Sequence, residues 1–275
     1  MLCSCLPSRR TRPTVVEQRK PYVPHRIVPA TLIIIPTYNE AGNIEVTVAN
    51  VQRALPQADI LIVDDGSPDL TGDIADRLAQ ANAGLFVLHR KQKTGLGATY
   101  LAGFDWAHQH GYTLIGEFDA DGSHPADALP RMMAAIESPA RPSLVIGSRW
   151  ARGGSVVGLP RGRELLSRGG NLYSRFMLQL PVADATAGFR LYRAEALRSI
   201  DLSSVDSRGY CFQIDLTRRL HNTGMTIVEV PIEFREREIG ESKMSRSIVV
   251  EALLRVTVWG VQGFARRLLR RPASR

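Results

Sequence analysis

The sequence contains little cysteine and no long apolar run, and each absence excludes a class of protein. Its 275 residues include three cysteines, Cys3, Cys5 and Cys211. Their number and spacing suit neither a disulfide framework nor a zinc site, so a reducing compartment fits. No uncharged apolar stretch reaches the roughly 18–20 residues of a membrane-spanning helix, and residues 1–10 lack the apolar core of a signal peptide. We therefore expect a protein that is soluble or lies on a membrane without crossing it.

Two common nucleotide-binding motifs are also missing. The chain has neither a Gly-x-Gly-x-x-Gly motif nor a Walker-type loop, which argues against a dinucleotide-dependent oxidoreductase and a P-loop kinase. The tract KTGLG at 93–97 has its glycines in the wrong places for either motif. It is more simply interpreted as a tight turn into a helix.

The positive charge is confined to the two ends of the chain. The formal net charge is +8, but residues 1–30 carry +5, residues 255–275 carry +6, and residues 31–254 carry −3. The mildly acidic centre argues against a cleft that follows a nucleic-acid backbone, and the tails have few aromatic side chains to stack on bases. The charge pattern therefore favours an anionic lipid surface over nucleic acid.

Apolar, β-branched runs alternate with helical patterns through the centre of the chain. The expected strands are 31–35, where Pro36 stops the run, 60–64, 84–88, 113–119, 144–147 and 226–234. The expected helices are 43–55, 71–82, 95–110, 125–138, 164–180 and 209–223. This alternation predicts an α/β fold with a mostly parallel sheet covered by helices on both faces. We expect a basic, disordered arm at 1–30, one α/β domain at 31–246, and an amphipathic helix in 247–275.

The C-terminal segment predicts a helix of a different kind. Its polar side chains form a single stripe, and nearly all the others are apolar; the stripe consists of Glu251, Arg255, Gln262, Arg266 and Arg270. A wide apolar face with a tryptophan and an arginine-rich end is typical of a helix in a membrane interface. Packing on the domain or on a partner chain is an equal alternative for 247–260, whereas membrane contact is favoured for 261–275.

Polar residues follow three of the expected strands, at 36–40, 64–67 and 119–122. Ligands of open parallel sheets bind at the carboxyl ends of strands. Helix capping explains one carboxylate per turn, but not two pairs, Asp64 with Asp65 and Asp119 with Asp121. We expect Asp64 or Asp65 to reach a ribose hydroxyl.

Asp119 and Asp121 lie on the same side of an extended segment, because side chains alternate along a strand. Two unpaired carboxylates would repel each other. A hard divalent cation, Mg²⁺ or Mn²⁺, removes that repulsion and leaves positions free for substrate phosphates. Ser123 and His124 are near enough in sequence to complete the shell. The pattern indicates a nucleotide diphosphate.

Arginines are frequent in the second half of the chain, and arginine binds phosphate bidentately. The candidates are Arg149, Arg152, Arg161, Arg163, Arg168, Arg190 and Arg237, with Lys243 six residues further on. A solvated surface is the plainer explanation for any single one, since the chain has 31 arginines and 4 lysines.

Several of these segments together resemble family 2 glycosyltransferases of the GT-A fold. The first half carries PTYNE (36–40), VDDGS (63–67), KTGLG (93–97), DAD (119–121) and GSR (147–149). The second half carries SRGGN (167–171), DATAGFRLY (184–192), GYCFQ (209–213) and GESK (240–243), which are similar to dolichol- or polyprenol-phosphate mannose synthases. The resemblance covers about residues 31–245, in order and at family spacing.

The resemblance implies a role for each matching position. The guanine and ribose end of GDP-mannose would be held by Pro36, Tyr38, Glu40, Val63 and Asp65. Asp119 and Asp121 would bind the metal and the diphosphate, Ser123 would be a further metal ligand, and Ala120 would line the site through its backbone. Arg149, Arg237 and Lys243 would contact the donor phosphates or the transferring sugar, and Arg163 would meet the acceptor phosphate with Arg190 as a helper. Asp121, Arg149 and Arg163 would be the catalytic residues.

The implied reaction is inverting transfer of mannose from GDP-mannose to a polyprenyl, dolichyl-type monophosphate, which gives a β-linked product. The enzyme would act as a peripheral protein at the cytoplasmic face of a membrane. A partner protein that anchors it to the membrane is compatible with this sequence. A polyprenyl-phosphate glucosyltransferase using UDP-glucose is the alternative within this class. Glycoside hydrolysis needs one protonated carboxyl, which two adjacent metal-binding carboxylates suit poorly. A module that binds nucleic acid or anionic lipid is the alternative from another class.

Overall fold

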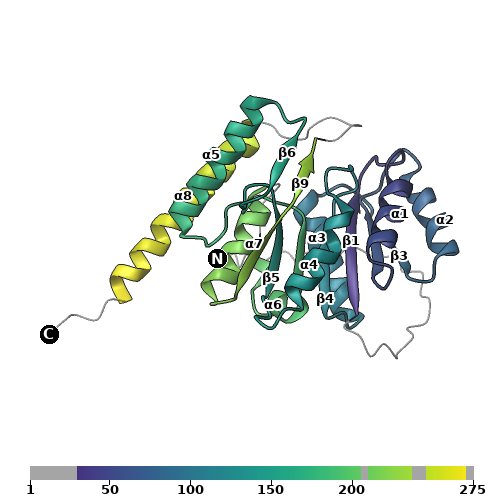
Figure 1. Cartoon of the computed structure of the whole chain (residues 1–275), viewed down its shortest axis with the longest axis horizontal. Helices are drawn as coiled ribbons and strands as arrows, with labels where there is room; N and C mark the ends of the chain where they lie inside the picture. Colours follow the sequence, from purple (N-terminus) through teal and green to yellow (C-terminus); the bar gives the residue numbers. More distant parts are fainter. Residues whose placement is uncertain (1–29, 206–209, 237–245, 271–275) are drawn as a thin grey trace, which may run out of the picture.

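The structure, a computed structural model, describes residues 30–205, 210–236 and 246–270. Its centre is a seven-stranded sheet in the order β3-β2-β1-β4-β7-β5-β8 (Figure 1). The strands are β1 (Thr31–Thr37), β2 (Asp59–Asp64), β3 (Leu85–His89), β4 (Leu114–Glu117), β5 (Leu144–Ser148), β7 (Arg190–Arg193) and β8 (Ile227–Pro231). All neighbours are parallel except β7, which runs antiparallel to both β4 and β5. The prediction of an α/β fold with a mostly parallel sheet is confirmed.

Helices cover both faces of this sheet, because its strands are apolar on both sides. In β1, Leu32 and Ile34 belong to one core cluster with residues of α3 and α7, while Ile33 and Ile35 belong to a second cluster with residues of α1 and α4. The helices are α1 (Ile44–Ala54), α2 (Thr71–Ala81), α3 (Leu96–Gln109), α4 (Leu129–Ile136), α5 (Arg161–Leu178), α6 (Ala194–Arg198), α7 (Tyr210–Asn222) and α8 (Arg246–Arg270). Two short 3-10 helices, η1 (Ala126–Ala128) and η2 (Leu202–Ser204), complete the elements.

Pro36 does not end the first strand, contrary to expectation, since β1 continues to Thr37. The carbonyl of Ile34 accepts a hydrogen bond from Phe118 on the β4 side, and that of Thr37 accepts one from Asp65 on the β2 side. Because successive residues alternate between the two neighbours, Pro36 faces the β4 side, where the pairing ends at Ile34. The missing N–H of Pro36 therefore removes no hydrogen bond from the sheet.

The expected strand at 226–234 is two strands. Ile232 separates β8 from β9 (Glu233–Arg235), which leaves the main sheet and pairs in parallel with β6 (Ser155–Val157). The small β6–β9 sheet lies beside the carboxyl edge of the main one (Figure 1). β6, β7 and α6 were not predicted, because each has only three to five residues and therefore too few for a periodic pattern.

Helix α8 packs along α5 and also contacts α7, and in Figure 1 the two long helices lie side by side at one end of the molecule. Val256 is buried, and Trp259 packs against the core with the Arg218 guanidinium 4.6 Å from its ring. Packing on the domain therefore describes this part of α8. Within the described ranges, no helix is both long and apolar enough to cross a membrane.

Candidate active site

Parallel pairing gathers the polar segments predicted from sequence at one edge of the sheet. Thr37 is in register with Asp64, and Ile34 with Glu117, so the ends of β1, β2 and β4 lie together. The loop after β4 is tied to α1 by the Thr47 hydroxyl, which donates to the Ala120 carbonyl at 2.9 Å. The carboxylates that follow β2 and β4 therefore border one site.

The acidic pair after β4 is held by neighbouring donors. Asp121 Oδ1 accepts the Ser123 backbone N–H at 3.1 Å and the Ser123 hydroxyl at 2.6 Å. Asp119 Oδ1 accepts the Tyr100 hydroxyl at 2.8 Å. The Ser123 hydroxyl, predicted to be a metal ligand, here orients Asp121.

The chemistry of this pair fits a hard divalent cation. Among the described residues, no three His, Cys, Asp or Glu side chains come together as a metal site. Mg²⁺ is commonly bound through one or two carboxylates and completes its shell with water and substrate phosphates. Asp119 and Asp121 with a nucleotide diphosphate supply that donor set, and the same oxygen ligands suit Mn²⁺.

His124 adds a buried, unsatisfied group beside the pair. Its ring stacks on Phe189, with 5.2 Å between the centroids and 12° between the planes. Neither ring nitrogen makes a hydrogen bond, although Nε2 lies 3.4 Å from Asp119 Oδ2. An orphaned imidazole nitrogen next to a carboxylate is further evidence for a ligand at this point.

The two carboxylates at the end of β2 are buried and hydrogen-bonded. Asp65 accepts hydrogen bonds from Arg90 and from the Thr99 hydroxyl, while Asp64 accepts from Thr37 and Ser67. These contacts hold the segments that follow β2 and β3 in place. A carboxylate has about four acceptor positions, so these contacts leave capacity for a ribose hydroxyl.

The remaining positions predicted to bind the nucleotide differ in access. Tyr38 is half-buried, with the Lys93 ammonium 3.9 Å from its ring centroid. Glu40 is half-buried and accepts a hydrogen bond from Asn43 at 2.8 Å. Val63 lies wholly in the core, so only its backbone can face a ligand.

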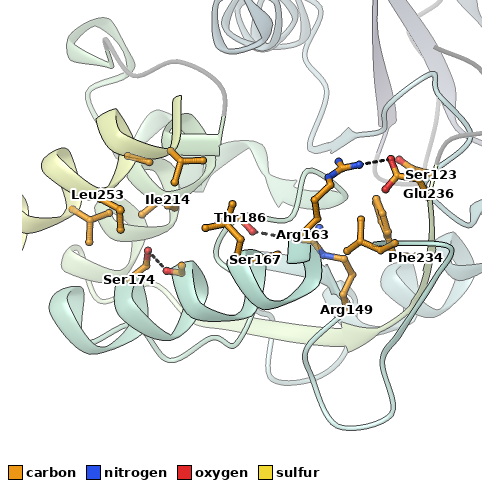
Figure 2. Close-up of a pocket in the computed structure, with 16 residues that line it drawn as sticks. Ser123, Arg149, Arg163, Ser167, Ser174, Thr186, Ile214, Phe234, Glu236 and Leu253 are labelled. Carbon is orange, nitrogen blue, oxygen red and sulfur yellow. Dashed lines mark hydrogen bonds and ion pairs between the residues drawn. The ribbon is translucent and has the colours of Figure 1, made fainter. Parts of the chain in front are cut away.

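A pocket of about 120 Å³ extends from this site towards the two long helices (Figure 2). One end is polar and is lined by Ser123, Arg149, Arg163 and Glu236. The other end is apolar and lies between α5, α7 and α8, with Leu166, Ile214, Val249, Ala252, Leu253 and Val256. The pocket is therefore amphiphilic along its length.

The two arginines of the pocket are paired differently. Arg149 binds Asp184 bidentately, with both N–O distances 2.7 Å, and also donates to Thr186. Arg163 donates to Glu236 Oε1 at 2.9 Å, and Glu236 Oε2 is buried without a hydrogen-bond partner. The pair with Arg149 uses both oxygens of its carboxylate, whereas the pair with Arg163 uses one.

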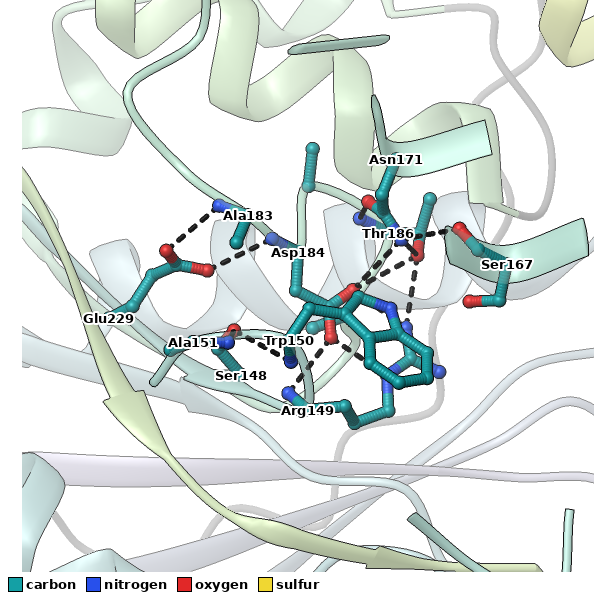
Figure 3. A network of polar contacts seen from close by, with 12 residues as sticks. Ser148, Arg149, Trp150, Ala151, Ser167, Asn171, Ala183, Asp184, Thr186 and Glu229 are labelled. Carbon is teal, nitrogen blue, oxygen red and sulfur yellow. Dashed lines mark hydrogen bonds and ion pairs between the residues drawn. The ribbon is translucent and has the colours of Figure 1, made fainter. Parts of the chain in front are cut away.

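A polar network fixes Arg149 (Figure 3). The Asp184 carboxylate is fully buried and also accepts from the Arg149 backbone N–H and from Asn171 of α5. Glu229 of β8 accepts the backbone N–H groups of Ala183 and Asp184 at 2.8 and 2.9 Å. The network joins the end of β5 to α5 and holds one wall of the pocket.

A comparison with protein families identifies the chain. Residues 32–201, more than half of it, match "Glycosyl transferase family 2". This chain belongs to glycosyltransferase family 2. The resemblance predicted from its motifs is confirmed, and so is its assignment as a glycosyltransferase.

Two relatives of this family 2 glycosyltransferase are similar over most of its length. A polyprenol monophosphomannose synthase of Mycolicibacterium smegmatis is 54% identical over 234 residues, covering 85% of this chain and 88% of the relative. An undecaprenyl-phosphate mannosyltransferase of Micrococcus luteus is 50% identical over 230 residues, covering 84% and 93%.

Solved structures show the same GT-A fold. Glucosyl-3-phosphoglycerate synthase from Mycobacterium tuberculosis with phosphoglyceric acid has a TM-score of 0.60 at 19% identity, covering 84% of this chain and 80% of that one. The same enzyme with Mn²⁺ and UDP-glucose has a TM-score of 0.58 at 18% identity, covering 85% and 78%. At this identity the likeness shows the fold alone.

One expected role in this glycosyltransferase is wrong. Arg190 was predicted to help bind the acceptor phosphate, but it is 1% exposed. Its guanidinium donates to the carbonyls of Ala185 and Ala187 and to the Thr217 hydroxyl. Arg190 is thus a structural residue of the core. Arg237 and Lys243 lie outside the described residues.

Three residues around the site of this glycosyltransferase were not singled out from sequence. Tyr100 is hidden in the apolar pattern of a helix, and Asp184 begins a matched motif that does not show which side chain it binds. Glu236 directly precedes Arg237, and only the fold brings it to Arg163. No local signal points to these pairings, because each joins elements far apart in sequence.

Proposed function

We propose that this family 2 glycosyltransferase transfers mannose from GDP-mannose to a polyprenyl monophosphate with inversion, forming a β-linked polyprenyl-phosphate mannose. The names of the two relatives, at 54% and 50% identity, support mannosyl transfer to a polyprenyl phosphate. GDP as the nucleotide rests on the motif resemblance.

The amphiphilic pocket is the observation that carries the proposal. A polyprenyl phosphate is an anion at one end and a hydrocarbon along the rest, and the pocket has the same order. Arg149 and Arg163 supply guanidinium groups near Ser123 at the polar end, and α5 and α8 supply apolar side chains beyond them. A water-soluble sugar acceptor would have no use for the apolar end.

Arg163 is the phosphate-binding residue in this proposal. Its guanidinium donates to one oxygen of Glu236, and the side chains of this pair are 30% and 21% exposed. Phosphate carries more charge than carboxylate and accepts bidentate hydrogen bonds from arginine. An incoming phosphate therefore replaces Glu236 on Arg163, while Arg149 stays fixed on Asp184.

The reaction requires no general base, because a phosphate monoester is already anionic near neutral pH. A phosphate oxygen of the acceptor attacks the anomeric carbon, the bond from that carbon to the β-phosphate oxygen breaks, and GDP leaves with the electron pair. No proton is transferred. Arg163 aligns the attacking oxygen, and catalysis rests on positioning and charge.

Asp119 and Asp121 would hold Mg²⁺ or Mn²⁺ together with the donor diphosphate. When bound, the cation neutralises the charge that develops on the departing GDP. Ser123 keeps Asp121 in place through its two hydrogen bonds.

An exposed apolar surface over α5 and α8 supports peripheral binding to a membrane, which we place at the cytoplasmic face. It consists of Leu165, Leu172 and Phe176 of α5 and Val250, Leu254, Val258, Val261 and Phe264 of α8, each at least half exposed. The apolar end of the pocket lies between the same helices. A lipid tail could therefore pass from the bilayer into the pocket without crossing water.

Acceptor specificity tests the proposal. The protein is incubated with GDP-[¹⁴C]mannose and either polyprenyl phosphate or the same polyprenol without phosphate, and lipids are then extracted. Label should enter the lipid with the phosphate alone. Equal labelling of the free alcohol would contradict the assigned role of Arg163.

A further inference from the structure

The Tyr100 hydroxyl lies behind the acidic pair. It donates to Asp119 Oδ1 at 2.8 Å, although Tyr100 belongs to α3 and Asp119 follows β4. The side chain of Asp119 is 26% exposed, whereas Tyr100 is wholly buried. The carboxylate is therefore held from the protein interior and faces the site.

The position of this hydroxyl is fixed by aromatic packing. The Tyr100 ring stacks against Phe104 and Phe212, with 6.3 Å between centroids in each case and interplanar angles of 24° and 6°. A ring confined in this way cannot swing its hydroxyl to another acceptor.

The backbone at Gly188 passes close to the other carboxylate oxygen, Asp119 Oδ2. A Cβ on Gly188 would lie 3.3 Å from Asp119 Oδ2 and 3.6 Å from His124 Nε2. Any side chain there would crowd the carboxylate, so glycine leaves space around Oδ2. With Oδ1 engaged by Tyr100, Oδ2 is the oxygen presented on the side of His124.

We propose that Tyr100 is a positioning residue that fixes the Asp119 carboxylate for a divalent cation; the role of the cation itself rests on the proposed function. Carboxylates that bind metals are commonly oriented by a second group, and loss of that group weakens metal binding by about 10- to 100-fold. A merely structural tyrosine would need an acceptor for its hydroxyl, but its loss would leave metal affinity unchanged.

Tyr100→Phe tests this and has a matched control. Tyr112 is also buried and donates to a carboxylate, Asp59 Oδ2, at the same 2.8 Å. Asp59 begins β2, so that bond lies at the opposite edge of the sheet. Tyr112→Phe therefore removes an equivalent hydrogen bond away from the site.

Mn²⁺ binding to the full chain is measured by electron paramagnetic resonance, with Mn²⁺ alone, with GDP and with UDP. We expect Tyr100→Phe to raise the dissociation constant of Mn²⁺ by about 10- to 100-fold and Tyr112→Phe to leave it unchanged. Phe212→Leu, which removes one stacked ring but leaves the hydroxyl, should weaken binding by a smaller factor. It serves as the test if Tyr100→Phe does not fold.

Equal Mn²⁺ affinity in the wild type and Tyr100→Phe would overturn the positioning role and leave the proposed function intact. Enhancement of Mn²⁺ binding by UDP and not by GDP would overturn the donor assignment, while the comparison of variants still decides the role of Tyr100. A wild type that binds no Mn²⁺ under any of the three conditions would overturn the positioning role as well.

Discussion

Glu236 illustrates how a single carboxylate can set the affinity for an anionic substrate. One of its oxygens accepts a hydrogen bond from Arg163, and in the proposed reaction the incoming phosphate competes with it. Asp184, by contrast, accepts hydrogen bonds from Arg149, Asn171 and Thr186. It binds Arg149 with both carboxylate oxygens, so a phosphate would displace it less readily. In the proposed reaction the two arginines therefore act differently: Arg149 shapes the pocket, and Arg163 binds the acceptor phosphate.

Replacing Glu236 with glutamine should lower the KM for polyprenyl phosphate. A neutral amide holds Arg163 less tightly and does not repel the phosphate, and a partly exposed ion pair of this kind corresponds to a factor of about 2–5. Initial rates at varied acceptor concentration give the KM. Glu233→Gln, which removes the partner of Arg235 on the same strand, is the control. A raised KM in Glu236→Gln would mean that the carboxylate orients Arg163 and does not compete.

Glu117 should make the stability depend on pH. Its side chain is wholly buried, and burial raises its pKa from the usual 4.5 to about 8 despite the nearby Arg190. The folded state therefore holds a proton that the unfolded state releases above about pH 4.5. This contribution is complete below that pH and is lost as the pH rises through about 8.

The free energy of unfolding of the wild type should thus fall relative to Glu117→Gln between about pH 5 and 8. The expected slope is up to about 1.4 kcal/mol per pH unit. Urea unfolding of both proteins at several pH values measures it, and contributions of other groups cancel in the difference. Two parallel curves would show that Glu117 is ionised in the folded protein.

At the scale of elements, burial on both faces decided which parts of the fold could be predicted. β1 and β2 are continuous apolar runs that pack on both sides of the sheet, so both strands could be predicted from sequence. β7 is equally central but reads RLYR. Its arginines pair inside the protein, Arg190 with backbone carbonyls and Arg193 with Pro142 and Ile136, and no sequence pattern shows that.

The site follows the same division. The position of Asp119 and Asp121 at the edge of the sheet could be predicted, because the strand ends of a parallel sheet meet at one edge. The role of Arg190 was mistaken, because a motif shows a residue type and not the direction of its side chain. Tyr100 was missed because its partner lies on another element.

Asp184→Asn should destabilise the protein strongly. It leaves the Arg149 guanidinium without its buried partner, which costs about 3–5 kcal/mol. Glu164→Gln removes the half-buried partner of the exposed Arg168 within α5 and should change stability by at most about 1 kcal/mol. Urea unfolding compares the two variants. Equal stability changes would show that the network around Asp184 does not hold β5 to α5.

At the scale of the whole molecule, the apolar surface of α5 and α8 should bind membranes. Phe176→Glu and Leu254→Glu place a charge on that surface, at positions 79% and 63% exposed. Both should reduce flotation with anionic phosphatidylglycerol liposomes, because a charged side chain opposes insertion into the interface. Val46→Glu, on α1 and 63% exposed, is the matched control. Unchanged flotation of both surface variants would place membrane binding elsewhere.

The donor and acceptor together form the central claim, and one measurement tests both. The protein is given GDP-[¹⁴C]mannose and UDP-[³H]glucose in the same reaction, with polyprenyl phosphate in liposomes and Mn²⁺, and with Asp121→Ala as the inactive control. The account predicts ¹⁴C in the extracted lipid, no ³H, and neither label with Asp121→Ala. Tritium without ¹⁴C, or full labelling by Asp121→Ala, would contradict it.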